Sequence, residues 1–144
     1  MKVLAIDYGT KRCGIAVGDC DLGIAHPLTT LINDGRLIKN LKDILSLRGT
    51  EEVIIGLPLN ADGTVSNIAK KAIRFAHIVS HELGIQVKMV DERFTTDMAK
   101  NILVEEGISA AKRKKKVDKI SASLILQLYF SNPSAAVTIR DLNP

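Results

Sequence analysis

The feature that most constrains the fold is the N-terminal segment, in which the apolar residues 3–6 end directly in Asp7. An apolar run of this length is typical of a buried strand, and Gly9 indicates a bend immediately after it. We therefore expect Asp7 at the end of a rigid strand, where a metal ligand can be held in place. A strand-end aspartate can equally make hydrogen bonds within a turn, so this segment alone leaves both interpretations open.

Length and composition predict one domain that spans residues 1–144 of the 144-residue chain. Hydrophobic residues make up 46% and aromatic residues 3%, which predicts an aliphatic core and argues against base stacking on aromatic platforms as the main mode of binding. No apolar run reaches the length of a membrane span, and Asp7 interrupts the first apolar stretch too early for a signal peptide. A cytoplasmic location is the resulting expectation. Cys13 and Cys20 are expected to be reduced thiols, with a zinc pair as the weaker alternative.

The positive charge of the chain is concentrated in one segment. The formal net charge is +4, from 20 basic and 16 acidic residues. Residues 112–116 (KRKKK) supply five of the basic residues, and without them 15 basic residues face 16 acidic ones. Such a patch attracts phosphates through counterion release. The alternative is a solvated run of charge in a loop.

Hydrophobic periodicity predicts strands and helices in a definite order. Strands are expected at 3–6, 13–17, 25–31, 53–56 and 87–90, with Pro27 indicating an edge strand. Helices are expected at 37–45, from Val65 or Ser66 to 79, from 95–97 to about 106, and after the basic run, with an apolar stripe from Val117 to Leu128. The predicted fold is α/β and ribonuclease H-like. Its mixed five-stranded sheet would have an antiparallel 1-2-3 meander and parallel strands 4 and 5, with helices on its faces.

Three acidic positions lie where a predicted element begins or ends. Asp7 ends the first strand, Glu92 follows the last strand beside Asp91, and Asp118 is expected to open the last helix. In open sheets, ligands gather beyond the carboxyl ends of the parallel strands. Three carboxylates without a nearby histidine or thiolate suit Mg²⁺ or Mn²⁺, which can activate water and stabilise the departing oxygen of a phosphodiester. We therefore predict Asp7, Glu92 and Asp118 as catalytic metal ligands.

Basic residues near these acids are candidates for holding the phosphates on either side of the cleaved bond. They are Lys11, Arg12, Arg93, Lys114, Lys115 and Lys116. Simpler interpretations stay open, because Asp118 can complement a helix dipole and Asp91 and Glu92 can pair with Arg93.

Four segments together resemble the YqgF/RuvX family: 7–16 (DYGTKRCGIA), 56–64 (GLPLNADGT), 91–96 (DERFTT) and 116–122 (KVDKISA). The family is described as Holliday junction resolvases and as nucleases that trim the 5′ end of precursor 16S ribosomal RNA. The resemblance implies a ribonuclease H-like nuclease, with Asp7, Glu92 and Asp118 as the metal-binding catalytic acids. The substrate would be precursor rRNA or branched DNA. Better-known resolvases of the superfamily carry an acid at the end of the fourth strand, where this chain has Gly56-Leu57-Pro58.

Other signals are given less weight. His77 and His81 have the i, i+4 spacing of metal ligands, but they are expected on a solvated helix face. The loop at residues 60–64 can contact substrate through its amides or form a plain turn. Tyr8 is expected to pack rather than to stack on a base.

Two other functions remain open. An ATP-binding module is suggested by the segment 7–10, which is similar to the phosphate-contacting turn of actin-like and sugar-kinase proteins. A nucleic-acid-binding factor without catalysis would account for the basic run equally well.

Overall fold

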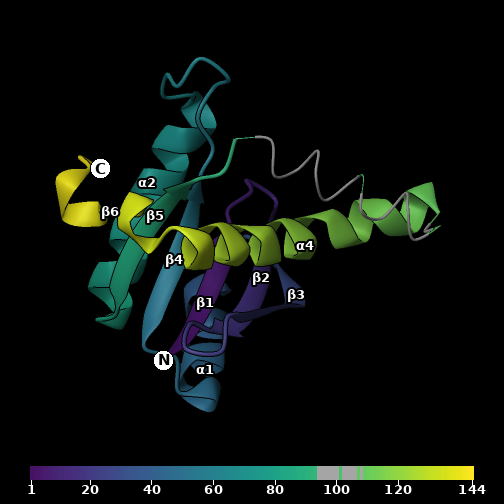
Figure 1. The fold of residues 1–144 in the computed structure, drawn as a ribbon, viewed down its shortest axis with the longest axis horizontal. Helices are drawn as coiled ribbons and strands as arrows, with labels where there is room; N and C mark the ends of the chain where they lie inside the picture. Colours follow the sequence, from purple (N-terminus) through teal and green to yellow (C-terminus); the bar gives the residue numbers. More distant parts are fainter. Residues whose placement is uncertain (94–100, 102–106, 108) are drawn as a thin grey trace.

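A computed structural model describes residues 1–93, 101, 107 and 109–144, apart from the side chains of residues 110, 111 and 113–116. Within these residues, strands of one sheet lie in the order β3-β2-β1-β4-β5-β6 (Figure 1). The strands are β1 Lys2–Asp7, β2 Arg12–Asp19, β3 Ile24–Ile32, β4 Glu52–Leu57, β5 Gln86–Asp91 and β6 Val137–Thr138. The helices are α1 Leu37–Arg48, α2 Asn67–Leu83 and α4 Ala110–Ser131, with short 3₁₀ turns η1 Pro133–Ala135 and η2 Ile139–Asp141.

The predicted topology is confirmed. β1, β2 and β3 form an antiparallel meander, and β4 and β5 are added in parallel beside β1. β3 is an edge strand, as Pro27 indicates, because a proline cannot donate a hydrogen bond to a further strand. The prediction of five strands was one short: the two residues of β6 pair antiparallel with β5, and so short a strand leaves no periodic signal.

Helices cover both faces of the sheet (Figure 1). α1 and α2 pack on one face against Leu4 and Ile6, and α4 crosses the other face over Val3 and Ala5. Side chains of a strand alternate between the two faces, so β1 contributes to both cores. β4 is buried along its whole length. In the described part of the chain, no helix is both long and apolar enough to cross a lipid bilayer.

The start of α2 confirms the sequence-based prediction for Ser66 and contradicts it for Val65. Ser66 is the N-cap, and its hydroxyl accepts the backbone N–H of Ala69 at 3.0 Å. Val65 was predicted on the buried face, but it precedes the helix and is half exposed.

The start of α4 was predicted wrongly. The helix begins at Ala110 after the N-cap Ser109, so the basic run 112–116 is helical and Asp118 lies inside the helix. Asp118 therefore does not complement the positive end of the helix dipole, which acts mainly within the first turn. Leu128, predicted on the buried stripe, is 37% exposed. The helix expected from Thr95–Asp97 to Glu106 lies outside the described residues.

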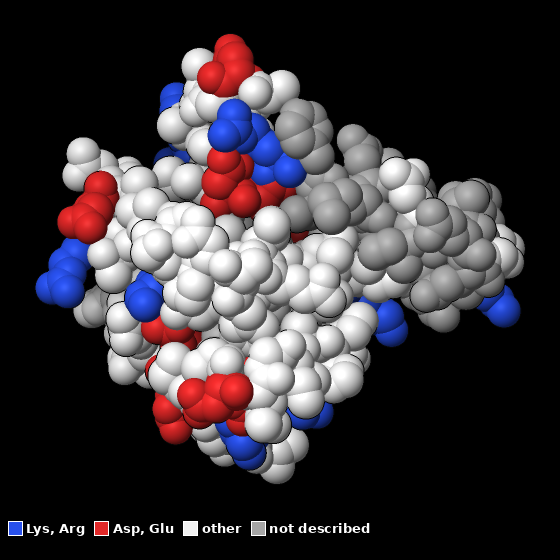
Figure 2. All heavy atoms as spheres, viewed as in Figure 1, with Lys and Arg blue, Asp and Glu red and all other residues white. Residues whose placement is uncertain are grey.

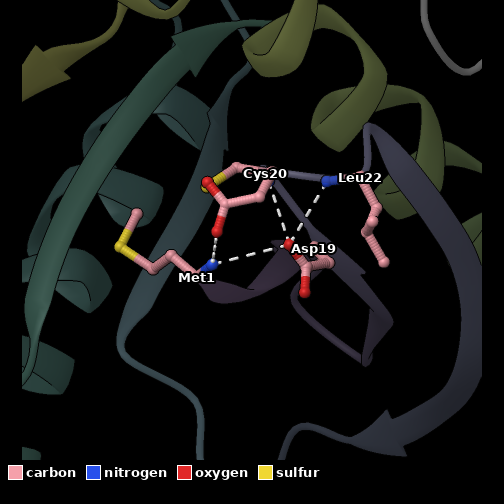
Figure 3. Close-up of polar contacts among 5 residues, drawn as sticks. Met1, Asp19, Cys20 and Leu22 are labelled. Carbon is pink, nitrogen blue, oxygen red and sulfur yellow. Dashed lines mark hydrogen bonds and ion pairs between the residues drawn. The ribbon is translucent and has the colours of Figure 1, made fainter.

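The N-terminus is tied to the β2–β3 turn (Figure 3). The ammonium group of Met1 pairs with the carboxylates of Asp19 and Asp21, and the hydrogen bond to Asp21 raises the pKa of this ammonium group to about 10. Asp19 also accepts the backbone N–H groups of Asp21 and Leu22. Cys13, in β2, and Cys20, just after it, are free thiols, as predicted.

A buried polar group links α4 to the sheet. The Tyr129 hydroxyl donates to Glu52 Oε1 at 2.6 Å, and Lys88 Nζ lies 3.3 Å from Glu52 Oε2. Glu52 is 3% exposed, so these partners compensate for its removal from water. This contact fixes the C-terminal half of α4 over β4 and β5.

A second contact fixes α4 over β2 without any side chain between them. A Cβ atom on Gly14 would lie 1.9 Å from the carbonyl oxygen of Asp118 and 2.7 Å from the backbone nitrogen of Lys119. Gly14 pairs with Asp7 across β1 and β2. The backbone of α4 therefore rests on the sheet next to Asp7, and only glycine leaves room for it.

We expect Gly14→Ala to lower the free energy of unfolding by about 2 kcal/mol or more, because the new methyl group forces α4 away from the sheet. Urea unfolding followed by circular dichroism measures this change. Gly35→Ala is the matched control. Nothing lies within 4 Å of the Cβ atom that this substitution adds, and we expect a change of at most about 0.5 kcal/mol in the free energy of unfolding. Equal effects of the two substitutions would contradict this account of how α4 packs.

Candidate active site

Asp7 is the last residue of β1, at the carboxyl end of the parallel strands. Alternation along β1 places its side chain on the α4 face, next to Val3 and Ala5. Its partner on β2 is Gly14, which has no side chain to separate Asp7 from Asp118 on α4. The approach of α4 to Gly14 thus brings together two acids that are far apart in the sequence.

Glu92 follows β5 and points back over the sheet. Its backbone N–H donates to the carbonyl of Leu57 at 3.2 Å, and its side chain is 6% exposed. A Cβ atom on Gly56 would lie 2.5 Å from Glu92 Cδ and 2.7 Å from both carboxylate oxygens. The end of β4, which lacks an acid, is therefore occupied by a carboxylate from the neighbouring strand, and Gly56 makes the space for it.

The carboxyl groups of Asp7 and Glu92 share a hydrogen bond. The pKa of Asp7 is raised to about 7, first because burial removes the carboxyl from water and second because Asp118 is negatively charged. The hydrogen bond with Glu92 acts in the opposite direction. The same two negative charges, Asp7 and Asp118, add to burial in raising the pKa of the neighbouring Cys13 thiol to about 11.

Asp118 is paired with Arg12, the first residue of β2. Arg12 Nε donates to Asp118 Oδ2 at 3.2 Å, and the two side chains are 46% and 26% exposed. Arg12 thus neutralises the negative charge of Asp118 at the edge of the site.

Asp91 and Glu92 have separate roles. Asp91 points outward and pairs with Arg93, whose Nη2 lies 2.7 Å from Asp91 Oδ2 and whose Nε lies 2.9 Å from it. Arg93 Nη1 donates to the carbonyl of Ala61 at 3.2 Å. Pairing with Arg93 was an open alternative for both Asp91 and Glu92. It occurs for Asp91, whereas Glu92 turns inward to Asp7. In this structure Arg93 connects the end of β5 to the 60–64 loop.

The other basic candidates lie on either side of the acids. Lys11 is an exposed residue of the β1–β2 turn. The backbone of Lys114, Lys115 and Lys116 belongs to α4, and their side chains lie outside the description. In Figure 2, acidic and basic atoms touch one another above the middle of α4, whereas the surface over its C-terminal half carries almost no charge. Residues 120–131 contain no charged side chain.

The acids have the ligand chemistry that Mg²⁺ or Mn²⁺ prefers, but they are not arranged as a finished metal site. Among the described residues, no three histidine, cysteine or acidic side chains are close enough together to hold a metal ion. Asp7 is hydrogen-bonded to Glu92 and its raised pKa favours a proton on its carboxyl, and Asp118 is held by Arg12. A divalent ion fits this set if it replaces the proton and the guanidinium, both of which are positive charges.

Some signals given less weight in the sequence have definite places here. His77 was expected on a solvated face, but its Nε2 lies 2.6 Å from the carbonyl oxygen of Leu142, so the helix contacts the C-terminal segment there. His81 is exposed. Tyr8 packs against Phe75 with ring centroids 4.8 Å apart, as predicted.

The 60–64 loop is closed by its own hydrogen bonds. Asn60 Nδ2 donates to Thr64 Oγ1 at 2.8 Å, and the backbone N–H of Thr64 donates to Asp62 Oδ1 at 2.9 Å. Both of these hydrogen bonds are exposed to solvent. The hydrogen bond from Arg93 to the carbonyl of Ala61 connects the loop to the site.

Sequence reasoning missed the contribution of Gly14 and Gly56, which make space for the acids. Each glycine lies inside an apolar strand pattern, and a glycine there often marks the close approach of another group. That signal was available in the segments 13–17 and 53–56. The group that approaches each glycine could not be predicted, because it comes from a distant part of the chain.

The pH dependence of stability tests the environment of Asp7. Because its pKa is raised in the folded state, the folded protein holds more protons than the unfolded chain between about pH 4 and pH 7. The free energy of unfolding should therefore fall as pH rises through this window and level off above it. Asp7→Asn cannot ionise at this position and should not show this fall. The variant should therefore gain a few kcal/mol of stability over wild type at pH 8 that it does not gain at pH 4.5. Urea unfolding across this pH range measures both proteins.

Asp43→Asn serves as the control, because Asp43 is exposed on α1, away from the site. It should keep the wild-type pH dependence. The same pH dependence in wild type and Asp7→Asn would show that Asp7 is not held in its neutral form by burial.

Comparisons with known proteins agree with the fold. The family model described as "RuvX: Holliday junction resolvase" matches residues 1–132. Relatives named "Putative pre-16S rRNA nuclease" include one from Escherichia coli, 42% identical over 89% of this chain and 94% of its own length. Another, from Clostridium kluyveri, is 39% identical over 93% of this chain and 99% of its own length.

Among solved structures, Thermus thermophilus RuvC in complex with a Holliday junction substrate aligns with a TM-score of 0.59 and 18% identity. The alignment covers 96% of this chain and 99% of RuvC. At this identity the match shows the ribonuclease H-like fold alone. The family match and the close relatives show more: the chain belongs to the RuvX (YqgF) family of nucleases, enzymes that hydrolyse phosphodiester bonds.

Proposed function

We propose that residues 1–144 act as one divalent-metal-dependent nuclease domain that processes the 5′ end of precursor 16S rRNA, in the cytoplasm. The observation that carries the proposal is the meeting of acids from three separate elements at the carboxyl end of the parallel strands. Asp7 bonds to Glu92, and the charge of Asp118 acts on Asp7. Buried acids that oppose one another's ionisation are common at catalytic sites and costly elsewhere.

In this proposal Asp7, Glu92 and Asp118 hold Mg²⁺ or Mn²⁺. When bound, the ion would activate a water molecule and stabilise the oxygen that leaves the phosphodiester. The pKa of Asp7, raised by burial and by Asp118, makes its carboxyl a group that gives up a proton when a cation arrives. Arg12, once it leaves Asp118, is free to bind a substrate phosphate.

The remaining basic residues bind the substrate backbone in this proposal. Lys11 follows Asp7 in the β1–β2 turn, and Lys114, Lys115 and Lys116 precede Asp118 on α4, so cations flank the acids on both elements. Arg93 contributes differently, because in the structure its guanidinium already holds Asp91 and Ala61. It can bind a phosphate only by exchanging one of these partners.

Precursor rRNA is the first choice of substrate because relatives that match nearly full length carry that name. Cleavage of branched DNA is the second candidate, and the description of the family model favours it. Against it stands the end of β4, where Gly56 replaces the acid of the better-known resolvases and Glu92 fills the space.

Cleavage assays test the assignment of the acids. We expect Asp7→Asn, Glu92→Gln and Asp118→Asn each to reduce cleavage by about two orders of magnitude or more, because each removes a charge that the ion needs. The assay compares a precursor 16S rRNA fragment with a four-way DNA junction, with Mg²⁺ or Mn²⁺ and with a chelator. Cleavage of the RNA alone supports the first substrate, and cleavage of the junction alone supports the second.

Asp91→Asn is the matched control. It removes a carboxylate one residue from Glu92 but outside the acid cluster, so activity should fall much less. If Asp91→Asn is as inactive as Glu92→Gln, the assignment is wrong. If wild type binds RNA but cleaves neither substrate with any ion, the chain is a binding factor without catalysis.

Arg12 gives a separate test of metal binding. An ion that takes Asp118 as a ligand must displace Arg12, and an exposed ion pair of this kind is worth about 0–1 kcal/mol. Arg12→Gln should therefore bind Mn²⁺ up to about fivefold more tightly than wild type in the absence of nucleic acid. Titration calorimetry measures this affinity, and Lys11→Gln, which removes a neighbouring charge, is the control. Weaker Mn²⁺ binding by Arg12→Gln than by Lys11→Gln would contradict the competition.

A further inference from the structure

A pocket of about 530 Å³ opens beside the candidate active site, on the opposite face of the sheet. Tyr8 and Thr10 of the β1–β2 turn line one side of it, and α1 and α2 line the others. Its volume lies within the range of small-molecule pockets, about 300–1,000 Å³. Neither the acid cluster nor the family comparison accounts for this pocket.

One part of the pocket is positively charged. Lys71 and Arg74 lie one turn apart on α2, and both are exposed. Within the described residues neither forms an ion pair. α1 begins at the pocket and has no acidic residue in its own first turn.

The pocket also contains one acid, Asp34. Its Oδ1 accepts the backbone N–H of Arg36 at 2.9 Å, which directs that oxygen to the start of α1. Two side-chain cations therefore outweigh one carboxylate, and the pocket favours an anion.

The other part of the pocket is apolar and partly flat. Tyr8 and Phe75 pack with an interplanar angle of 37°, and Tyr8 remains half-buried. Ile38 and Ile78 complete this wall, and Ile78 is 43% exposed. A ligand with a phosphate and a flat apolar ring matches the two parts together, and a nucleotide has both groups.

The position of the pocket relates it to the acids. Tyr8 directly follows Asp7, and successive side chains of a strand point to opposite faces. Asp7 therefore faces α4, whereas Tyr8 packs with Phe75 of α2. A nucleic acid strand that crosses the end of β1 passes from one site to the other.

We propose that this pocket binds a nucleotide of the substrate strand next to the nucleotide that is cleaved. The proposal rests on the proposed nuclease function and adds a binding subsite to it. Lys71 and Arg74 bind the phosphate, and the wall that contains Tyr8 and Ile78 contacts the sugar and base. The subsite is built from elements of the α1 and α2 face, separate from the basic run of α4.

Binding of a labelled single-stranded RNA tests the subsite without requiring cleavage. All variants carry Asp7→Asn, so that no substrate is consumed during the measurement. Fluorescence anisotropy gives the affinity at several salt concentrations. Lys71 and Arg74 neutralise one phosphate in this proposal, so losing both should reduce the slope of log affinity against log salt by about 0.7 on a single strand. We expect this change, with several-fold weaker binding, for Lys71→Ala/Arg74→Ala.

The control is Lys42→Ala/Arg48→Ala, which removes two exposed charges of α1 that do not line the pocket. It should leave the slope almost unchanged. Ile78→Asn tests the apolar wall independently, and it should weaken binding because it replaces an apolar contact with a polar side chain and leaves the charge unchanged. Circular dichroism checks that all variants keep their helix content.

Adenosine monophosphate, added at millimolar concentration, distinguishes a polynucleotide from a free nucleotide. We expect it not to displace the RNA. If it binds tightly to the parent protein and not to Lys71→Ala/Arg74→Ala, while RNA binding is the same in both, the pocket takes a free nucleotide and the proposal is wrong. Equal slopes for the pocket variant and the control also overturn it. If neither wild type nor the Asp7→Asn protein binds nucleic acid, the proposed nuclease function is wrong, and the subsite that rests on it is wrong as well.

Discussion

The contact between the backbone of α4 and Gly14 is the constraint on which the candidate site depends. Helix and sheet touch there without a side chain between them, so the position of Asp118 relative to β1 is fixed by backbone atoms. The bond from Tyr129 to the buried Glu52 holds the same helix further along. Two anchors at different points of α4 limit both its sliding and its rotation, and Asp118 therefore stays near the end of β1.

The acids that this packing assembles are costly to bury together, and the structure compensates for them in two ways. Burial and the charge of Asp118 raise the pKa of Asp7, so that this carboxyl keeps its proton more readily, and Arg12 pairs with Asp118. Proton and guanidinium thus supply positive charge where three negative groups meet. A divalent cation supplies the same charge at one point, and so in the proposed function metal binding, proton release and freeing of Arg12 are a single exchange.

Much of this arrangement could be predicted from the sequence because it follows from local patterns. Apolar runs gave the strands, Pro27 indicated the edge, and Ser66 marked the start of α2. The start of α4 was misplaced because the run of lysines resembles a loop, whereas in the structure Ser109 caps the helix ahead of it. The pairing of Arg12 with Asp118 could not be predicted, since it joins residues 106 positions apart and depends on the packing of α4 on Gly14.

The alternation of side chains at the end of β1 also determines how a nucleic acid can lie on the protein. Asp7 faces α4 and Tyr8 faces α2, so the two adjacent residues belong to different surfaces that meet at the rim of the sheet. Basic residues occur in the elements on both sides of this rim: the segment 112–116 belongs to α4, and Lys71 and Arg74 belong to α2. The C-terminal half of α4 has no charged residue to attract a phosphate (Figure 2). In the proposed function, these charges would draw a bound strand across the end of β1, from the start of α4 toward α2, rather than along the length of α4.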